Sequence, residues 1–127
     1  MAWVLDGDRP IYAQLVERLQ IDIISGVYPP GGKLPSVREF AAMAAVNPNT
    51  MQKAFSELEK SGLIITQRTN GRIVTEDERL IEESKRELAK RHALDFFSGM
   101  EGLGYTKAQA VSFLREMEGD GADEWSD

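Results

Sequence analysis

The stretch from Leu34 to Val74 limits the fold of this 127-residue chain most, because it holds start signals for two helices. Ser36 and Glu39 form the S-x-x-E pattern of a capping box, in which each side chain accepts a hydrogen bond from the other residue's backbone N–H. Asn47-Pro48 is a second start signal, because asparagine caps a helix and proline suits its first position. The sequence therefore predicts two short helices in close succession.

A hairpin is expected directly after the second of these helices. Gly62 tolerates the left-handed turn that ends a helix, and the segment from Leu63 to Gln67 contains β-branched residues that favour a strand. Asn70-Gly71 is typical of a tight hairpin turn, after which the segment from Ile73 to Thr75 returns as a second strand. Because a two-stranded hairpin is marginal alone, we expect it to pack on the helices. This order is that of a helix-turn-helix with a wing, which places a helix in the major groove of DNA.

One helix is expected before this stretch. Pro10 suits a helix start, and apolar residues recur at four-residue steps from Ile11 to Ile23, which predicts a helix to about Ser25 with one buried face. Residues 1–9 are interpreted as a polar lead-in. Trp3 and Trp125 lie in the terminal segments and receive no function.

Two further helices are expected after it. A long charged helix is predicted from Asp77 to about Met100, with Gly99, Gly102 and Gly104 breaking it, and a second capping box at Thr106-Lys-Ala-Gln opens another helix. The apolar residues of these two helices cover a face that is too wide for helices standing alone in water. We therefore expect a helical hairpin that dimerises with a second copy of itself. The residues predicted for this dimer interface are Leu80, Ile81, Leu88, His92, Phe96, Phe97, Met100, Val111, Phe113, Leu114 and Met117.

The predicted fold class is mainly α and has three parts. Residues 1–75 form a winged helix-turn-helix of three helices and a two-stranded β wing, residues 76–118 form a short C-terminal helical dimerisation hairpin, and residues 119–127 form an acidic, disordered tail. The net charge of −6 divides along the same line. Residues 1–75 carry eight Lys or Arg against seven Asp or Glu (+1), and residues 76–127 carry seven against fourteen (−7). The acid therefore lies outside the predicted DNA-binding part.

Composition excludes several classes of protein and site. No cysteine means no disulfide framework, and a single histidine excludes a multi-histidine metal site within one chain. The sequence shows no nucleophile and base pairing and no phosphate-cradling glycine motif, so we expect no enzyme, no cofactor and no metal. It also shows no secretory leader and no membrane span, which indicates a soluble, cytoplasmic protein. His92 is left open between an interface or core histidine and a metal or effector ligand.

Two motifs carry a family resemblance over roughly residues 10–75. Leu34-Pro-Ser-Val-Arg-Glu and Val46-Asn-Pro-Asn-Thr-Met-Gln-Lys-Ala-Phe-Ser-Glu-Leu-Glu-Lys-Ser-Gly-Leu-Ile resemble the GntR family of bacterial winged-helix transcriptional regulators. The Asn-Pro-Asn-Thr string and the short helical C-terminal part resemble the YtrA-type subfamily in particular. The resemblance implies a homodimeric repressor without a large effector domain, and many such members regulate neighbouring transporter genes. A near-palindromic DNA operator is then the expected partner.

The resemblance also implies a set of DNA contacts. Arg38 corresponds to the family's base or phosphate contact near the start of its helix. Many relatives have arginine where Pro48 and Gln52 stand here, so an arginine contact to guanine is lost at these two positions. In the wing, relatives usually have glycine where Thr69 stands. The predicted DNA-binding residues are Lys33, Ser36, Arg38, Asn47, Asn49, Thr50, Gln52, Lys53, Arg68, Thr69, Asn70, Gly71 and Arg72.

Chemistry supports part of this set and leaves part open. Gln52 and Asn49 can each pair with adenine through two hydrogen bonds, and Lys53 supplies charge to phosphate. Arg68 and Arg72 either reach the minor groove from the wing or are ordinary strand-edge charges that discourage aggregation.

Two alternatives remain at this stage. The chain could be a winged-helix adaptor for protein interactions, with the acidic C-terminal helices as its docking surface. An unknown small-molecule effector could bind in a cavity between the helical hairpins, and no membrane partner is expected.

Overall fold

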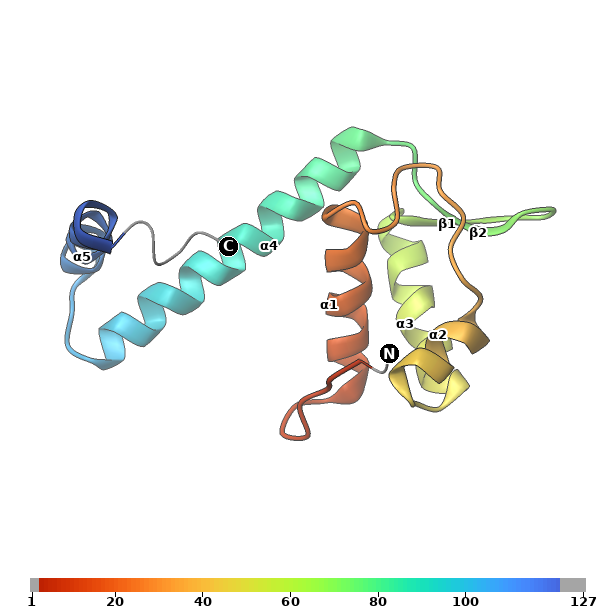
Figure 1. The fold of residues 1–127 in the computed structure, drawn as a ribbon, viewed down its shortest axis with the longest axis horizontal. Helices are drawn as coiled ribbons and strands as arrows, with labels where there is room; N and C mark the ends of the chain where they lie inside the picture. The colour runs from red at the N-terminus through yellow and green to blue at the C-terminus, as the bar shows by residue number, and fades with distance from the viewer. Residues whose placement is uncertain (1–2, 122–127) are drawn as a thin grey trace. The chain divides into compact units, whose positions relative to one another are not determined.

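The computed structural model describes residues 3–121 and confirms the predicted mainly helical fold, a winged helix-turn-helix followed by C-terminal helices (Figure 1). These residues form two compact units, one ending at Lys85 and the other beginning at Arg86. In chain order the elements are α1 (Ile11–Ile24), α2 (Val37–Ala44), α3 (Pro48–Ser61), β1 (Ile64–Gln67), β2 (Gly71–Val74), α4 (Glu78–Gly102) and α5 (Lys107–Gly121).

Both predicted start signals work as helix caps. The hydroxyl oxygen of Ser36 accepts from the backbone N–H of Glu39 at 3.1 Å, and the Glu39 carboxylate accepts from the backbone N–H of Ser36 at 3.1 Å. The side-chain oxygen of Asn47 accepts from the backbone N–H of Asn49 at 2.7 Å, with proline in the first helical turn. Gly62 ends α3 in the left-handed region at φ +86°. Local sequence signals therefore set the bounds of α2 and α3.

The ring of Phe40 lies at the centre of the core of the N-terminal unit. Its centroid is 5.4 Å from that of Phe55, 5.6 Å from that of Tyr28 and 5.9 Å from that of Trp3. The prediction for α1 is wrong at Ile11, which is 37% exposed in the first turn. The other buried residues with large apolar side chains in this core are Leu15, Leu19, Ile23, Leu34, Met51, Leu58, Leu63, Ile64 and Val74.

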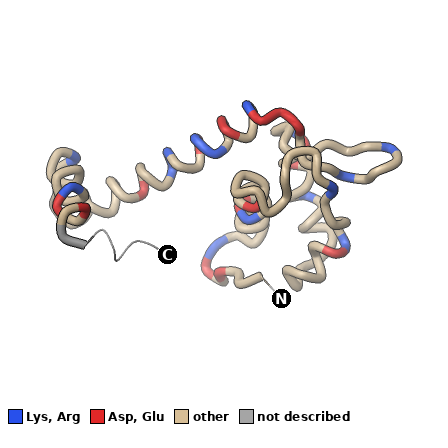
Figure 2. The backbone as a smooth tube through the Cα atoms, turned by 45° about the horizontal axis from the view of Figure 1, so that its top comes forward, with Lys and Arg blue, Asp and Glu red and all other residues tan. Residues whose placement is uncertain are grey.

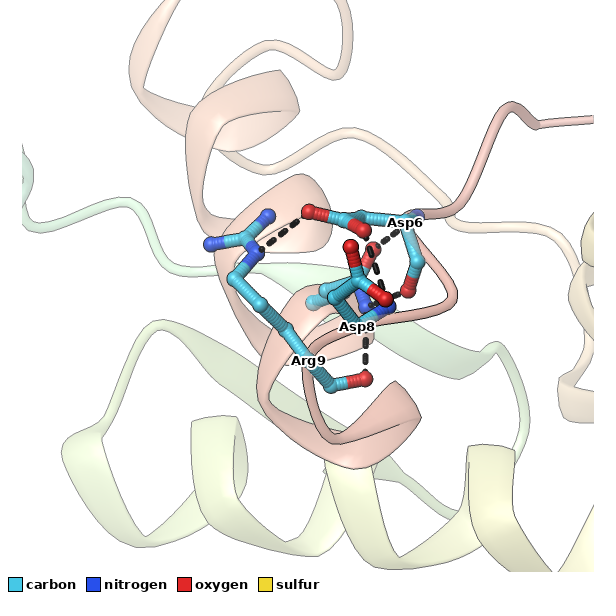
Figure 3. Close-up of polar contacts among 4 residues, drawn as sticks. Asp6, Asp8 and Arg9 are labelled. Atoms are coloured by element: carbon cyan, nitrogen blue, oxygen red, sulfur yellow. Dashed lines mark hydrogen bonds and ion pairs between the residues drawn. The ribbon is translucent and has the colours of Figure 1, made fainter.

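The interpretation of residues 1–9 as a polar lead-in is wrong for the described part, residues 3–9, which we call the N-terminal strap. Trp3 is buried against Phe40, and its backbone N–H donates to the carbonyl of Met43 at 3.0 Å. The Gln14 amide accepts from the backbone N–H of Asp6 at 2.6 Å and donates to the carbonyls of Asp6, at 2.6 Å, and Arg9, at 3.0 Å (Figure 3). The strap therefore belongs to the folded unit.

Replacing Gln14 by alanine is expected to lower the free energy of unfolding by about 1–3 kcal/mol, because the strap would lose a buried amide that bonds it three times. Urea denaturation measures the change, and Gln52→Ala is the matched control because its amide is exposed. The control should change the free energy by less than about 0.5 kcal/mol. A similarly small change for Gln14→Ala would mean that the amide does not hold the strap.

The hairpin register differs from the predicted turn. Gln67 pairs with Gly71, so the loop consists of residues 68–70 and Gly71 belongs to β2, at φ +69°. Asn70-Gly71 is therefore not the centre of the turn. A three-residue hairpin loop followed by a left-handed residue has this geometry, and glycine adopts it without a steric penalty.

The expected packing of the hairpin on the rest of the unit is confirmed. The segment before α2 lies along β2, where the backbone N–H of Leu34 donates to the Arg72 carbonyl at 2.9 Å and the N–H of Val74 donates to the Gly32 carbonyl at 2.9 Å. Ile64 and Val74 are buried in the core. The wing is thereby attached to the helices through both backbone and side chains.

The start of α4 belongs to the N-terminal unit. Leu80 and Ile81 are half-buried against the core of that unit, and the Gln20 amide donates to the hydroxyl of Ser84 at 2.8 Å. The unit therefore ends at Lys85, beyond the predicted boundary at residue 75. Leu80 and Ile81, which are predicted for the dimer interface, thus also pack within their own chain.

The C-terminal unit consists of the rest of α4 and α5. Thr106 and Gln109 form the predicted capping box, with reciprocal bonds of 2.9 Å and 3.2 Å. Gly99 does not break α4, which continues to Gly102 because a single glycine lowers helix stability without preventing the helix. α5 continues to Gly121, so residues 119–121, predicted as tail, are helical. The remaining tail residues 122–127, with Trp125, lie outside the described residues.

Candidate nucleic-acid interface

The face of α3 that points away from the core is polar. Asn49, Gln52 and Lys53 are exposed on it, and Thr50 and Ser56 are half-buried. The hydroxyl of Ser56 donates to the Gln52 carbonyl at 3.0 Å, while the Gln52 amide makes only a long, 3.5 Å contact with that hydroxyl. The Gln52 amide is thus available to pair with a base edge, for which it has both a donor and an acceptor.

The starts of α2 and α3 carry one exposed arginine and two side chains that are already hydrogen-bonded as helix caps. Arg38 is the second residue of α2 and is exposed. The side-chain oxygens of Ser36 and Asn47 are already used as caps, so their predicted contacts with DNA would have to come from their remaining polar groups or from the helix starts that they stabilise.

An open groove of about 620 Å³ runs along the polar face of α3. The Tyr12 hydroxyl at the start of α1 donates to the Glu57 carboxylate at 3.3 Å across it. Desolvation, and then the Glu57 charge, raise the pKa of Tyr12. The groove is lined by Tyr12, Thr50, Gln52, Lys53, Ser56, Glu57 and Lys60.

The predicted DNA-binding set omits four polar residues of this groove, namely Tyr12, Ser56, Glu57 and Lys60. Lys60 follows Lys53 by seven residues and therefore shares its helix face, a spacing that could have identified it. No signal in the sequence places Tyr12 beside α3, because the contact joins two helices far apart in the chain.

The wing presents a polar loop at its tip. Arg68, Thr69 and Asn70 are exposed, and the Asn70 amide donates to the Gln67 side chain at 3.1 Å. Lys33 is exposed next to β2, where it forms a backbone bridge with Ile73. Figure 2 shows Lys and Arg, in blue, on the projecting hairpin. The wing can therefore offer positive charge to a phosphate backbone.

Arg72, one of the predicted contacts with DNA, is partly covered by other residues of its own unit. Its Nε atom is 2.9 Å from Oε1 of Glu59 on α3, and its guanidinium carbon lies 5.3 Å from the ring centroid of Phe55. Its side chain is 27% exposed. Of the two arginines that flank the wing tip, Arg68 is the exposed one.

The residues predicted for the dimer interface differ in exposure. Leu88 is buried, Phe113 and Leu114 are 38% and 45% exposed, and His92 is exposed. The half-buried members are Phe96, Phe97, Met100, Val111 and Met117. The structure adds three exposed apolar residues that the prediction omitted, namely Leu94, Leu103 and Tyr105. Exposed apolar side chains of this kind can contribute to an interaction surface.

Two other kinds of site were sought within residues 3–121. No group of three or more His, Asp or Glu side chains is placed there to hold a metal ion. No helix in this range has the length and apolar character needed to cross a bilayer.

Comparison with known proteins places these features in a family. Residues 11–74 match the model described as "Bacterial regulatory proteins, gntR family". The chain is 32% identical over 115 residues to the HTH-type transcriptional repressor YtrA of Bacillus subtilis (strain 168), which covers 90% of this chain and 88% of the relative. A solved GntR family transcriptional regulator from Listeria monocytogenes superposes with a TM-score of 0.79 at 39% identity, over 88% of this chain and 98% of that one. The AraR DNA-binding domain solved in complex with operator ORX1 gives a TM-score of 0.50 at 28% identity, over 59% of this chain and 92% of that one.

Proposed function

This chain belongs to the GntR family and is a DNA-binding transcriptional regulator, not an enzyme; we propose that it acts as a homodimeric repressor of a near-palindromic operator. The observation that carries the proposal is the exposed polar face of α3, with Asn49, Gln52 and Lys53, on a helix whose start is fixed by Asn47 and Pro48. A helix start of this kind, rigidly held and rich in amide groups, is suited to reading base edges.

In the proposed complex each α3 enters a major groove. Gln52 and Asn49 read adenine, Arg38 and Lys53 bind phosphate or base, and Arg68 extends from the wing toward the minor groove. The two half-sites lie about one helical turn, 10–10.5 bp, or a multiple of it apart. Because the phosphate contacts release counterions, affinity should fall steeply as salt rises.

A second copy of the chain is the proposed partner of the C-terminal unit. Residues 86–127 carry five Lys or Arg against nine Asp or Glu, a balance that repels DNA, so the exposed apolar residues of the unit suit a partner other than nucleic acid. A twofold dimer buries one surface against itself and matches the symmetry of a near-palindrome. The acidic residues at the rim of such an interface would stay solvated.

The proposed targets are transporter genes next to the regulator's own gene, as in many YtrA-type regulators, and its place of action is the bacterial cytoplasm, where the operator lies. A small-molecule effector, if the protein uses one, is not assigned to the groove along α3. That groove contains Gln52 and Lys53, which the proposal gives to DNA.

Fluorescence anisotropy with labelled DNA from upstream of the gene separates this proposal from the adaptor alternative. We expect a saturable complex that a scrambled duplex does not form and that weakens as salt rises from 50 to about 200 mM. An adaptor that docks proteins through its acidic helices would form no specific complex with this DNA in moderate salt.

Replacing Gln52 by alanine is expected to relax the preference at one base position of each half-site, because the amide supplies about 1–3 kcal/mol of discrimination there. A panel of operators, each changed at one base pair, measures the effect by anisotropy. Equal weakening on every operator would instead identify Gln52 as a contact that positions the protein without reading sequence.

A further inference from the structure

Arg72 connects the wing to α3, the helix that the proposed function places in the major groove. It lies on β2, while its partner Glu59 lies in the last turns of α3, and the Nε to Oε1 distance of 2.9 Å is that of a charge-assisted hydrogen bond. The guanidinium also packs near the ring of Phe55 in the core. Among the described residues, the other ion pairs join residues three or four positions apart in one segment. Within residues 3–121, the ion pair of Arg72 and Glu59 is therefore the one that joins separate elements.

The backbone of Arg72 makes a third connection. The Arg72 carbonyl accepts from the N–H of Leu34 in the segment that leads to α2, and Arg72 pairs with Thr66 across the hairpin. Both side chains of the ion pair are about two-thirds or more covered, at 27% exposed for Arg72 and 32% for Glu59. Side chain and backbone together hold the hairpin against α3 at the residue pair next to the one that closes the loop.

We propose that Arg72 is a positioning residue, which holds the wing at a fixed angle to the recognition helix through Glu59 so that Arg68 reaches DNA. The inference rests on the proposed function, because it assumes that α3 and the wing bind one operator together. Arg68 begins the loop that follows the Gln67–Gly71 pair, so the contact of Arg72 with α3 lies one residue pair from the loop that carries Arg68. Arg72 thus acts on DNA binding without contacting DNA.

The alternative, a direct contact between Arg72 and phosphate, predicts an opposite response to loss of Glu59. If Arg72 contacts DNA, Glu59→Gln would release it and strengthen binding. If Arg72 positions the wing, Glu59→Gln loosens the wing and removes part of the contribution of Arg68. Under either hypothesis Glu59→Gln also removes one negative charge, which by itself changes the affinity for DNA. The effect of this lost charge therefore has to be measured with a separate variant.

Glu57 supplies the matched control. It lies two residues before Glu59 on α3, but its carboxylate accepts from the Tyr12 hydroxyl and has no contact with the wing among the described residues. Glu57→Gln therefore makes the same charge change without touching the ion pair.

The experiment is a double-mutant cycle on the full chain, read by operator anisotropy. The fold-change in affinity caused by Arg68→Ala is measured in the wild type, in Glu59→Gln and in Glu57→Gln. We expect about tenfold or more in the wild type and in Glu57→Gln, and less than about threefold in Glu59→Gln. Arg72→Met should reduce the contribution of Arg68 in the same way, and Arg72→Lys should restore part of it because a lysine can still pair with Glu59.

Several results would overturn the inference. These are an Arg68 contribution that is unchanged in Glu59→Gln, one that falls equally in Glu57→Gln, and one that is already absent in the wild type. Failure of the wild type to bind any operator specifically would instead overturn the proposed function. Circular dichroism of each variant, with the wild-type helix signal expected, confirms that the measured changes belong to a folded protein.

Discussion

Replacing Arg38 by alanine is expected to lower operator affinity by about 30-fold to 10,000-fold while leaving the dimer intact. The side chain is exposed at the start of α2, and the structure shows no ion pair for it among residues 3–121. One arginine contact with a base contributes about 1–3 kcal/mol, and a dimer loses two, so the total loss is about 2–6 kcal/mol.

Anisotropy with the operator measures the loss, and light scattering checks that the variant is still a dimer. Arg79→Ala is the matched control, because Arg79 is an exposed arginine at the start of α4 that pairs with Glu83 on its own helix. The control should bind nearly as well as the wild type. If folded Arg38→Ala bound the operator within threefold of the wild type, the assigned DNA-binding face would be wrong.

Replacing Phe113 by aspartate is expected to convert the proposed dimer to a monomer and to lower operator affinity by about 100-fold to 10,000-fold. Phe113 is partly exposed on α5, beside the ring of Tyr105 at 6.2 Å between centroids. A charge at an apolar interface is costly because it would be desolvated without a partner. A monomer binds one half-site and loses the gain that comes from linking two.

Light scattering and anisotropy on the same samples test this expectation together. Ser112→Asp adds the same charge at the neighbouring exposed position and should remain a dimer. Leu114→Asp, at another exposed apolar position of α5, should behave like Phe113→Asp. Dimers for both apolar variants, with unchanged operator affinity, would place the interface elsewhere.

Local signals explain which parts of the fold could be predicted. The capping box of Ser36 and Glu39, the Asn47 cap and the left-handed Gly62 each depend on residues within a few positions of one another, and all were predicted. The buried face of α3 follows from periodicity in the same way. The order of elements and the DNA-binding class were therefore accessible from the sequence.

Contacts between distant residues explain what could not be predicted. The strap is held by Gln14 and buries Trp3, but an amide and an aromatic residue near a terminus carry no pattern that reveals this. Likewise Arg68 and Arg72 both flank the tip of the wing in the sequence, and only the position of Glu59 on α3 shows that Arg72 is partly covered while Arg68 is exposed. The residues at a winged-helix surface can be listed from motifs, whereas their roles depend on packing.

The position of the boundary between the two units could not be predicted for a similar reason. Leu80 and Ile81 share the helical apolar pattern of the residues that follow them in α4, so periodicity assigned them to the dimer interface. In the structure they complete the core of the N-terminal unit. A single continuous helix can thus serve two units, and its sequence pattern does not show where one ends.

The most direct test of the central claim is the stoichiometry of the complex with the operator, measured by titrating the protein into a footprinted site and into each half-site alone. We expect two chains for each full operator, two protected major-groove segments about one helical turn or a multiple of it apart, and much weaker binding to a single half-site. One chain bound to a site without repeated halves, at the same affinity as the full operator, would contradict this expectation.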